Sequence, residues 1–335
     1  MSDDDHSGPA PESSPDGGFR EDILYVQETA GTVHFLLIAY RPGEEAQAAG
    51  YLFRRRAGDD GPAENVLATN DPLRELWVSA PGHPWVTSGT GLVWTTAPVP
   101  WPDDDDPDPG LEFEVPEGGL RWRHHRLPPQ ESDGARPRPW SIWGTSDRDV
   151  HIGTFGGVLY HWDGERWTQH DPGLGRPLGC IRGRSPGDVY AVGYGSTLLH
   201  FDGHRWRPLP DPDGPDTGDI LSGIAFAPDG EVLISGRSRG GRILRGSAEA
   251  GFTVRARCGL PLADVAVVGD RVFLAAGRSG AAELTPAGVH VLRDDLHPWT
   301  VTGGGDGVVR FTISPPEAAY AELDPEGGGW REVGY

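Results

Sequence analysis

Aspartate and histidine residues that recur at a fixed spacing are the first candidates for chemistry. Asp149 and His161 return 39 residues later as Asp188 and His200. Carboxylates and imidazoles serve as general acids and bases or as metal ligands. Repetition, however, places the copies on separate structural units, and a recurring residue fills the same structural role in each copy. We therefore predict that these histidines bond to turn backbone and that these aspartates bond turn amides, with no catalytic role.

Two acidic segments are candidates for cation binding. One is Asp103 to Asp108, within WPDDDDPDPG, and the other is the loop Asp211 to Asp219. Carboxylates suit a hard cation such as Ca²⁺. The first segment lacks the Asp-x-Asp-x-Asn/Asp-Gly loop and a distal glutamate, and its prolines favour an extended loop. The second is rich in proline and glycine and is interpreted as a plain connection. The sequence thus predicts no metal site.

Enzyme and cofactor motifs give no positive indication. The chain contains no suitably placed G-x-S-x-G, H-E-x-x-H, phosphate-binding loop or dinucleotide fingerprint. All 29 basic residues are arginines, which excludes Schiff-base lysine chemistry. We predict no catalytic residues and no cofactor.

A third group of candidates consists of aromatic and arginine side chains in short glycine-rich segments. They are Phe155, Tyr194, Arg237, Arg239 and Arg278. Aromatic residues and arginine are enriched among the residues that dominate protein interfaces. Guanidinium groups suit an acidic peptide, a phosphate or a protein carboxylate. Whether these residues share a surface depends on the elements that carry them.

Those elements belong to a repeat of short strands. Residues 141–170 and 180–209 are two copies of one pattern, each with two β-prone runs, an Asp-Gly turn and a following tryptophan. Weaker copies precede and follow them. A repeat of about 40 residues built from short strands is typical of a β-propeller blade. The sequence predicts an all-β chain with a single β-propeller of seven four-stranded blades; six or eight blades remain open alternatives.

The expected domain organisation follows the composition. Residues 1–19 are predicted to be a disordered acidic tail, and residues 20–335 a propeller with an acidic insert at 98–118. The blade that carries the insert is expected to close with residues 119–123. In every blade, the loops between the second and third strands emerge on one face, together with the connections between blades.

The net charge of −21 is concentrated in the tail and the insert. Non-specific nucleic-acid binding needs a basic surface, so we predict none. Cys180 and Cys258 lack metal-ligand spacing; Cys180 is expected to be a buried thiol, and a disulfide between the two stays open. With no signal-like or membrane-spanning stretch, a cytoplasmic monomer is expected, although export without a signal stays open.

The repeats resemble a bacterial propeller pattern frequent in proteins of myxobacteria and their relatives. The pattern W-G-x-S-x-x-D-V begins at Trp143, and the D-G-x-x-W end recurs at Asp163 and Asp202. That end also looks like the turn of photosystem-assembly-factor-like and Asp-box propellers. The full S-x-D-x-G-x-x-W box is absent, so the resemblance gives no support to sialidase activity. It implies a β-propeller and no particular activity.

The predicted function is a non-catalytic binding module or scaffold that engages a protein partner through one loop face. Phe155, Tyr194, Arg237, Arg239 and Arg278 are the expected contact residues. One alternative is an immunity-type protein whose acidic surface neutralises a basic toxin. Another is a carbohydrate-active propeller enzyme, which would require acidic residues or histidines of different blades to converge on one pocket.

Overall fold

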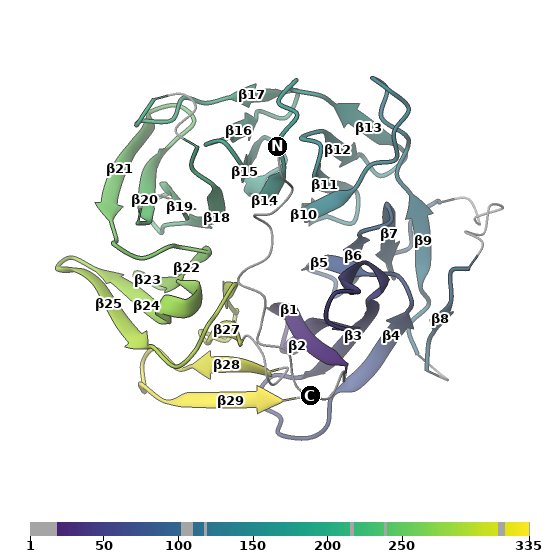
Figure 1. Ribbon diagram of the computed structural model, residues 1–335, viewed down its shortest axis with the longest axis horizontal. Helices are drawn as coiled ribbons and strands as arrows, with labels where there is room; N and C mark the ends of the chain where they lie inside the picture. Colours follow the sequence, from purple (N-terminus) through teal and green to yellow (C-terminus); the bar gives the residue numbers. More distant parts are fainter. Residues whose placement is uncertain are drawn as a thin grey trace.

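The computed structural model describes residues 19–101, 110–116, 119–214, 218–237, 240–313 and 319–334. They form a ring of seven antiparallel sheets, which confirms the predicted all-β propeller and its blade count (Figure 1). Two short 3₁₀ helices, η1 (Glu45–Gln47) and η2 (Gly277–Ser279), lie in loops. Within the described ranges no helix is long and apolar enough to cross a membrane.

The first three blades, from the innermost strand outward, are as follows: blade 1, β1 (Arg20–Thr29), β2 (Thr32–Tyr40), β3 (Ala49–Arg56), β4 (Glu64–Thr69) and β8 (Phe113–Glu114); blade 2, β5 (Leu73–Val78), β6 (Pro84–Ser88), β7 (Leu92–Thr95) and β9 (Arg123–Arg126); blade 3, β10 (Pro139–Ser146), β11 (Asp149–Thr154), β12 (Leu159–Trp162) and β13 (Trp167–His170).

The remaining four blades use consecutive strands: blade 4, β14 (Leu178–Ser185), β15 (Asp188–Gly193), β16 (Leu198–Phe201) and β17 (Trp206–Pro208); blade 5, β18 (Leu221–Phe226), β19 (Val232–Gly236), β20 (Arg242–Ser247) and β21 (Gly251–Arg257); blade 6, β22 (Asp264–Val268), β23 (Arg271–Ala275), β24 (Ala281–Thr285) and β25 (Gly288–Arg293); blade 7, β26 (Val301–Gly303), β27 (Val309–Ile313), β28 (Ala319–Leu323) and β29 (Trp330–Gly334).

The chain between β7 and β9 departs from the repeat. Its strand β8 pairs with β4, so it adds a fifth strand to blade 1 before β9 completes blade 2. The prediction that residues 119–123 close blade 2 is wrong, because β9 begins only at Arg123. Trp122 is instead buried against blade 1, where its indole nitrogen donates a 2.7 Å hydrogen bond to the Val66 carbonyl. Asp103 to Asp108, the core of the acidic insert, and the tail residues 1–18 lie outside the described residues.

The predicted Asp-Gly turns end the third strands of blades 3 and 4. The Asp163 carboxylate accepts hydrogen bonds from the amides of Glu165 and Arg166, at 2.9 and 2.8 Å, and Asp202 does the same one blade later. Gly164 takes a φ of 93°, a conformation that a residue with a Cβ rarely adopts. The turn residues thus recur for a local backbone reason.

The hydrophobic core lies between neighbouring blades rather than at one centre. Trp85 of blade 2, for example, belongs to one buried cluster with Ile142 and Tyr160 of blade 3. A sheet enclosed on both faces has apolar residues at successive positions, which explains runs such as Val189 to Val192. Each fully buried large apolar side chain contributes about 1.5–3 kcal/mol.

Side-chain contacts close the ring between blades 1 and 7. Thr302 donates a 2.9 Å hydrogen bond to the Val26 carbonyl, and the Gly305 amide donates one of 2.6 Å to Glu28. Farther out, the Phe35 and Tyr320 rings lie 5.8 Å apart. In the described parts of the chain, all strands of blade 7 come from the C-terminal end and none from the N-terminal end. We call this joint the seam.

Candidate functional site

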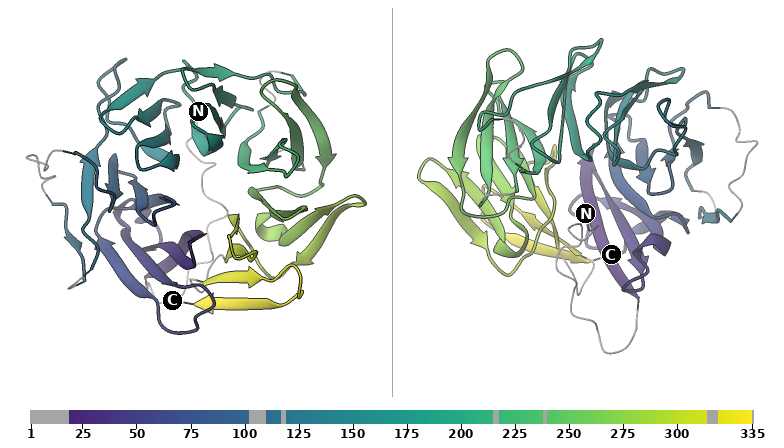
Figure 2. Two further views of the ribbon diagram at one scale, coloured as in Figure 1. Left: turned by 180° about the vertical axis from the view of Figure 1, so that it is seen from behind. Right: turned by 45° about the horizontal axis from the view of Figure 1, so that its top comes forward.

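The innermost strands of the blades surround a central channel that contains two cavities. Figure 2 shows from behind how the blades are arranged around the ring axis. The cavities have volumes of about 230 and 350 Å³, and Tyr25, Arg182 and Asp264 line both of them. These three side chains come from blades 1, 4 and 6, so their meeting depends on the closed ring.

An arginine and two carboxylates form an ionic cluster at the middle of the channel. Arg182 Nη1 lies 3.1 Å from Glu75 Oε1, and Arg182 Nη2 donates to the Tyr25 hydroxyl. Glu75 is buried, and its second oxygen accepts a 3.2 Å hydrogen bond from the Ile142 amide. Glu75 belongs to blade 2 and Arg182 to blade 4, so the contact joins two blades that blade 3 separates.

Asp264 is the second carboxylate of the cluster. Its two oxygens accept hydrogen bonds from the Val265 and Val301 amides, at 2.9 and 3.1 Å. Burial raises the pKa of Asp264 to about 6 despite the opposing charge of Arg182. Burial likewise raises the pKa of Glu75 to about 7. Two carboxyl groups that titrate near neutral pH thus share one arginine in the channel.

Aromatic side chains surround the mouth of the smaller cavity. Trp140, Tyr194, Arg237 and Trp299 all line it. The Arg237 guanidinium lies 4.8 Å from the centre of the Trp299 ring, a cation–π geometry, and Trp299 is 38% exposed. Phe155 stacks on Trp140 with 5.3 Å between ring centres. We call these five residues the rim.

Additional arginines lie near the rim. Arg138 lies 4.8 Å from the centre of the Phe155 ring, and Arg74 lines the cavity itself. Burial, and next the charge of Arg138, lowers the pKa of Arg74. Like charges held this close raise the affinity of the mouth for an anion.

The five residues predicted from loop positions do not all lie at the rim. Phe155, Tyr194 and Arg237 come together at the rim. Arg278 is exposed in η2, next to Gly277, whose amide donates a 3.0 Å hydrogen bond to Pro298 beside Trp299. Arg239 lies outside the described residues. Trp140, near the start of β10, and Trp299, on the connection between β25 and β26, were not among the predicted residues.

The repeated histidines have partners other than the predicted ones. His161 Nε2 lies 2.7 Å from Asp149 Oδ1, and His200 lies 3.0 Å from Asp188 in the next blade. The prediction that they bond to turn backbone is wrong. The cross-strand register places each histidine diagonally opposite its aspartate, so the two side chains bond each other.

The loop from Asp211 to Asp219 holds a cation supplied by the chain. The buried Arg242 side chain contacts the carboxylates of Asp211, Asp213 and Asp219, at 2.5, 2.7 and 2.7 Å. Among the described residues of this loop, these three carboxylates are therefore already matched to a guanidinium. The loop serves to join blade 4 to blade 5, in line with the predicted connecting role.

The fold and its ionic channel define the class as a seven-bladed β-propeller. No family model and no curated protein matches the chain. Solved structures do match it. One is a catalytically inactive virginiamycin B lyase from Staphylococcus aureus with quinupristin, at 11% identity and a TM-score of 0.60, over 88% of this chain and 96% of that one.

Two further structures show the same likeness. A chain of the Mitotic Checkpoint Complex matches with a TM-score of 0.61 and 13% identity, over 98% of this chain and 96% of that one. YCF48 bound to D1 peptide matches with a TM-score of 0.54 and 14% identity, over 78% and 80%. At these identities the likeness shows the propeller fold alone.

Proposed function

We propose that this protein is a non-catalytic binding module that engages a protein partner through the rim. The observation that carries the proposal is the ring of aromatic and arginine side chains around the 230 Å³ cavity. A cavity of that size accommodates one or two side chains, so the partner presents a short segment rather than a whole domain. The arginines select acidic side chains or a terminal carboxylate.

The likeness to a propeller whose structure is described as bound to a peptide supports the same use of the fold. The alternative of an immunity-type protein has less support at this surface. A basic toxin would be repelled by Arg74, Arg138 and Arg237, whereas an acidic segment would be attracted. We therefore place partner recognition at the rim and keep the acidic insert as a source of long-range attraction or repulsion.

The test compares binding of two fluorescent peptides of equal length, poly-glutamate and poly-lysine. We expect the full chain to bind the glutamate peptide and Arg237→Glu combined with Arg278→Glu to weaken binding at least about tenfold. Arg166→Glu is the matched control, because Arg166 is 81% exposed on an Asp-Gly turn away from the rim. Equal binding of both peptides, or an unchanged affinity in the double variant, would refute the proposal.

The channel cluster favours a second candidate function, a carbohydrate-active enzyme. Glu75 and Asp264 come from different blades and meet at one cavity, which is the arrangement that such an enzyme needs. Acid–base catalysis works best with groups that titrate near the working pH. Glycan hydrolysis that is lost in both Glu75→Gln and Asp264→Asn would select this function; equal rates in wild type and variants would eliminate it.

Origin, location and assembly belong to the same proposal. The repeat pattern supports a bacterial protein of the type frequent in myxobacteria, and we further propose that it acts in the cytoplasm as a monomer. The charge of −21 opposes nucleic-acid binding. Light scattering after size exclusion, and a DNA-binding titration at low salt, test the last two points; a dimer mass or salt-dependent DNA binding would count against them.

A further inference from the structure

An acid–base contact between the second and third strands recurs around the ring. It occurs at the same strand positions in four successive blades, and in blade 6 the signs of the charges are exchanged. The pairs are Asp149 with His161 (2.7 Å), Asp188 with His200 (3.0 Å), Glu231 with Arg245, and Arg271 with Glu283 (2.7 Å). The pair alone is a structural feature of the blades and indicates no ligand.

Blade 3 adds a third polar side chain to this contact. His151 follows Asp149 by two residues on β11, so both side chains lie on one face, and it pairs in register with His161 on β12. In the next three blades the position of His151 is held by Tyr190, Leu233 and Phe273. Packing therefore does not require an imidazole there.

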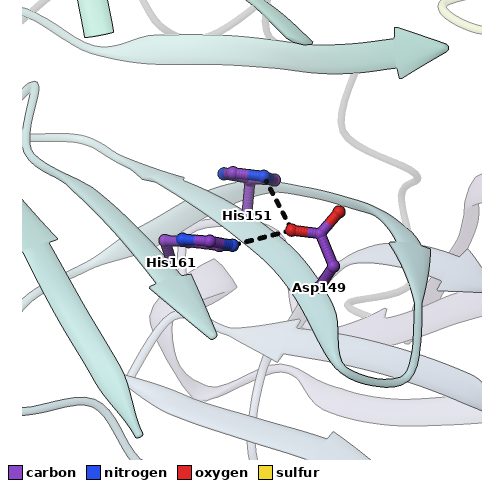
Figure 3. A group of neighbouring side chains, drawn as sticks. All are labelled: Asp149, His151 and His161. Carbon is purple, nitrogen blue, oxygen red and sulfur yellow. Dashed lines mark hydrogen bonds and ion pairs between the residues drawn. The ribbon is translucent and has the colours of Figure 1, made fainter. Parts of the chain in front are cut away.

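The His151 imidazole is buried and makes no hydrogen bond to the described residues. Its side chain is 0% exposed, and within the described part of the chain both ring nitrogens lack a hydrogen-bond partner. His151 Nε2 points toward Asp149 and lies 3.4 Å from Oδ1, beside the His161 ring (Figure 3). A buried imidazole whose polar contact is this one long approach to a carboxylate is poorly satisfied, and that calls for a reason.

The charge around the aspartate also differs between the two copies. In blade 4, Arg184 Nε donates a 2.7 Å hydrogen bond to Asp188 Oδ2 and supplies a positive charge. The residue at the same place in blade 3, 39 positions earlier, is Thr145, whose neutral hydroxyl donates to Asp149 Oδ2. Blade 3 thus has an extra imidazole where blade 4 has a tyrosine, and lacks the cation that blade 4 has.

We infer that Asp149, His151 and His161 bind a divalent transition-metal ion of the zinc class. Asp149 Oδ1 and the Nε2 atoms of the two histidines are the ligands; the three residues offer ligand atoms within 4.8 Å of one another. Two imidazoles and a carboxylate suit Zn²⁺, with water at the remaining position. Thr145 orients the carboxylate through its other oxygen. The sequence alone predicted no metal here.

Binding requires a small movement of the rings. The two imidazoles stack with 4.2 Å between centres and 1° between planes, whereas a metal ion must lie in the plane of each ring. Each ring therefore tilts toward the ion. No hydrogen bond holds the His151 ring in its present orientation, so the tilt breaks none there.

Blade 4 supplies the variants for the test. His151→Tyr and Thr145→Arg each introduce the residue that blade 4 carries at the same place, so both substitutions are compatible with a folded blade. The first removes a ligand, and the second keeps all three ligands but brings in a competing cation. His200→Gln is the control, because it removes the equivalent histidine of blade 4.

The probes are Zn²⁺ in calorimetry and Co²⁺ in visible absorption, with the full chain treated first with a chelator. We expect one high-affinity ion per chain in wild type and in His200→Gln, with cobalt bands that report nitrogen ligands. Both blade 3 variants should weaken binding more than about tenfold. Circular dichroism checks that each variant is folded.

Two results would overturn the inference. One is the absence of zinc or cobalt binding by the wild-type chain. The other is an affinity in Thr145→Arg and His151→Tyr equal to that of wild type, which would place any bound ion elsewhere. Because wild type and Thr145→Arg retain every ligand, the test remains decisive if His151→Tyr fails to fold.

Discussion

Replacing Arg242, the buried first residue of β20, with methionine should strongly destabilise the protein. The side chain is 1% exposed and contacts three carboxylates. Asp211 and Asp219 are themselves buried, with side chains 3% and 0% exposed. Methionine keeps the length of the aliphatic stem but leaves these charges without a cation.

The expected loss follows from the cost of an unpaired buried charge. Removing one partner of a buried ion pair costs about 3–5 kcal/mol. A domain is stable by only about 5–15 kcal/mol, so the midpoint of urea unfolding should fall strongly. Urea is preferable to guanidinium because guanidinium, as a salt, screens the charges under test.

Arg257→Met is the matched control. Arg257 contacts Asp213 at 2.8 Å, as Arg242 does, but is 56% exposed. An exposed pair contributes about 0–1 kcal/mol. Equal unfolding midpoints for Arg242→Met and Arg257→Met would refute the reasoning that burial makes this contact essential.

The pH dependence of stability provides a second test of the contact between Arg242 and Asp211. Burial alone would raise the pKa of Asp211, but the hydrogen bonds and charge of Arg242, together with the hydrogen bond from the Asp213 amide, lower it overall. A carboxyl group with a depressed folded-state pKa stabilises the fold above its unfolded pKa, about 4, and loses that contribution in more acidic solution. Arg242→Met should already lack this contribution at pH 7.

Two further predictions concern the channel and the seam. Raising the pH from 5 to 8 should lower the free energy of unfolding by about 2–3 kcal/mol through Glu75. The pKa of Glu75 is about 7 in the folded protein, above its ordinary value of 4.5. The folded protein therefore keeps the proton to a higher pH than the unfolded chain, and the stabilisation is lost as the pH rises through 7. Urea titrations of Glu75→Gln should show a flatter pH profile, and an unaltered profile would contradict the burial of this charge. At the seam, Glu28→Ala removes the acceptor of the Gly31 and Gly305 amides, both at 2.6 Å, and should cost about 1–3 kcal/mol. Limited proteolysis should then cut β1 or β26 faster; equal resistance would show that other contacts close the ring.

Much of the fold was predictable because the local chemistry of the strands and turns is explicit. Asp163-Gly164 and its copy mark hairpins. Strands whose two faces pack against neighbouring blades are apolar at successive positions. Blade 2 was harder to predict, because the chain after β7 first adds β8 to blade 1 and only then forms β9, the last strand of blade 2. The pairing of β8 with β4 and the hydrogen bond from Trp122 to Val66 are tertiary contacts that no local sequence pattern encodes.

The candidate site was predictable in part for a related reason. Loop positions follow from strand order, so the sequence could place Phe155, Tyr194 and Arg237 on one face of the ring, while their role in binding stays a prediction. The channel cluster was missed because its members are far apart in sequence and meet only in the closed ring. A blade-by-blade alignment contains the signal: Arg182 takes the place of Trp143, and Glu75 takes the place of Ser141.

The seam has a mechanical consequence. A ring whose ends share a strand resists opening through a ladder of backbone hydrogen bonds, whereas blades 1 and 7 meet through side chains and a few isolated bonds. Under tension, the two blades should part at the seam while every sheet stays intact. Opening and closing of the ring at this joint would therefore leave the hydrogen-bonded ladder of each sheet unbroken.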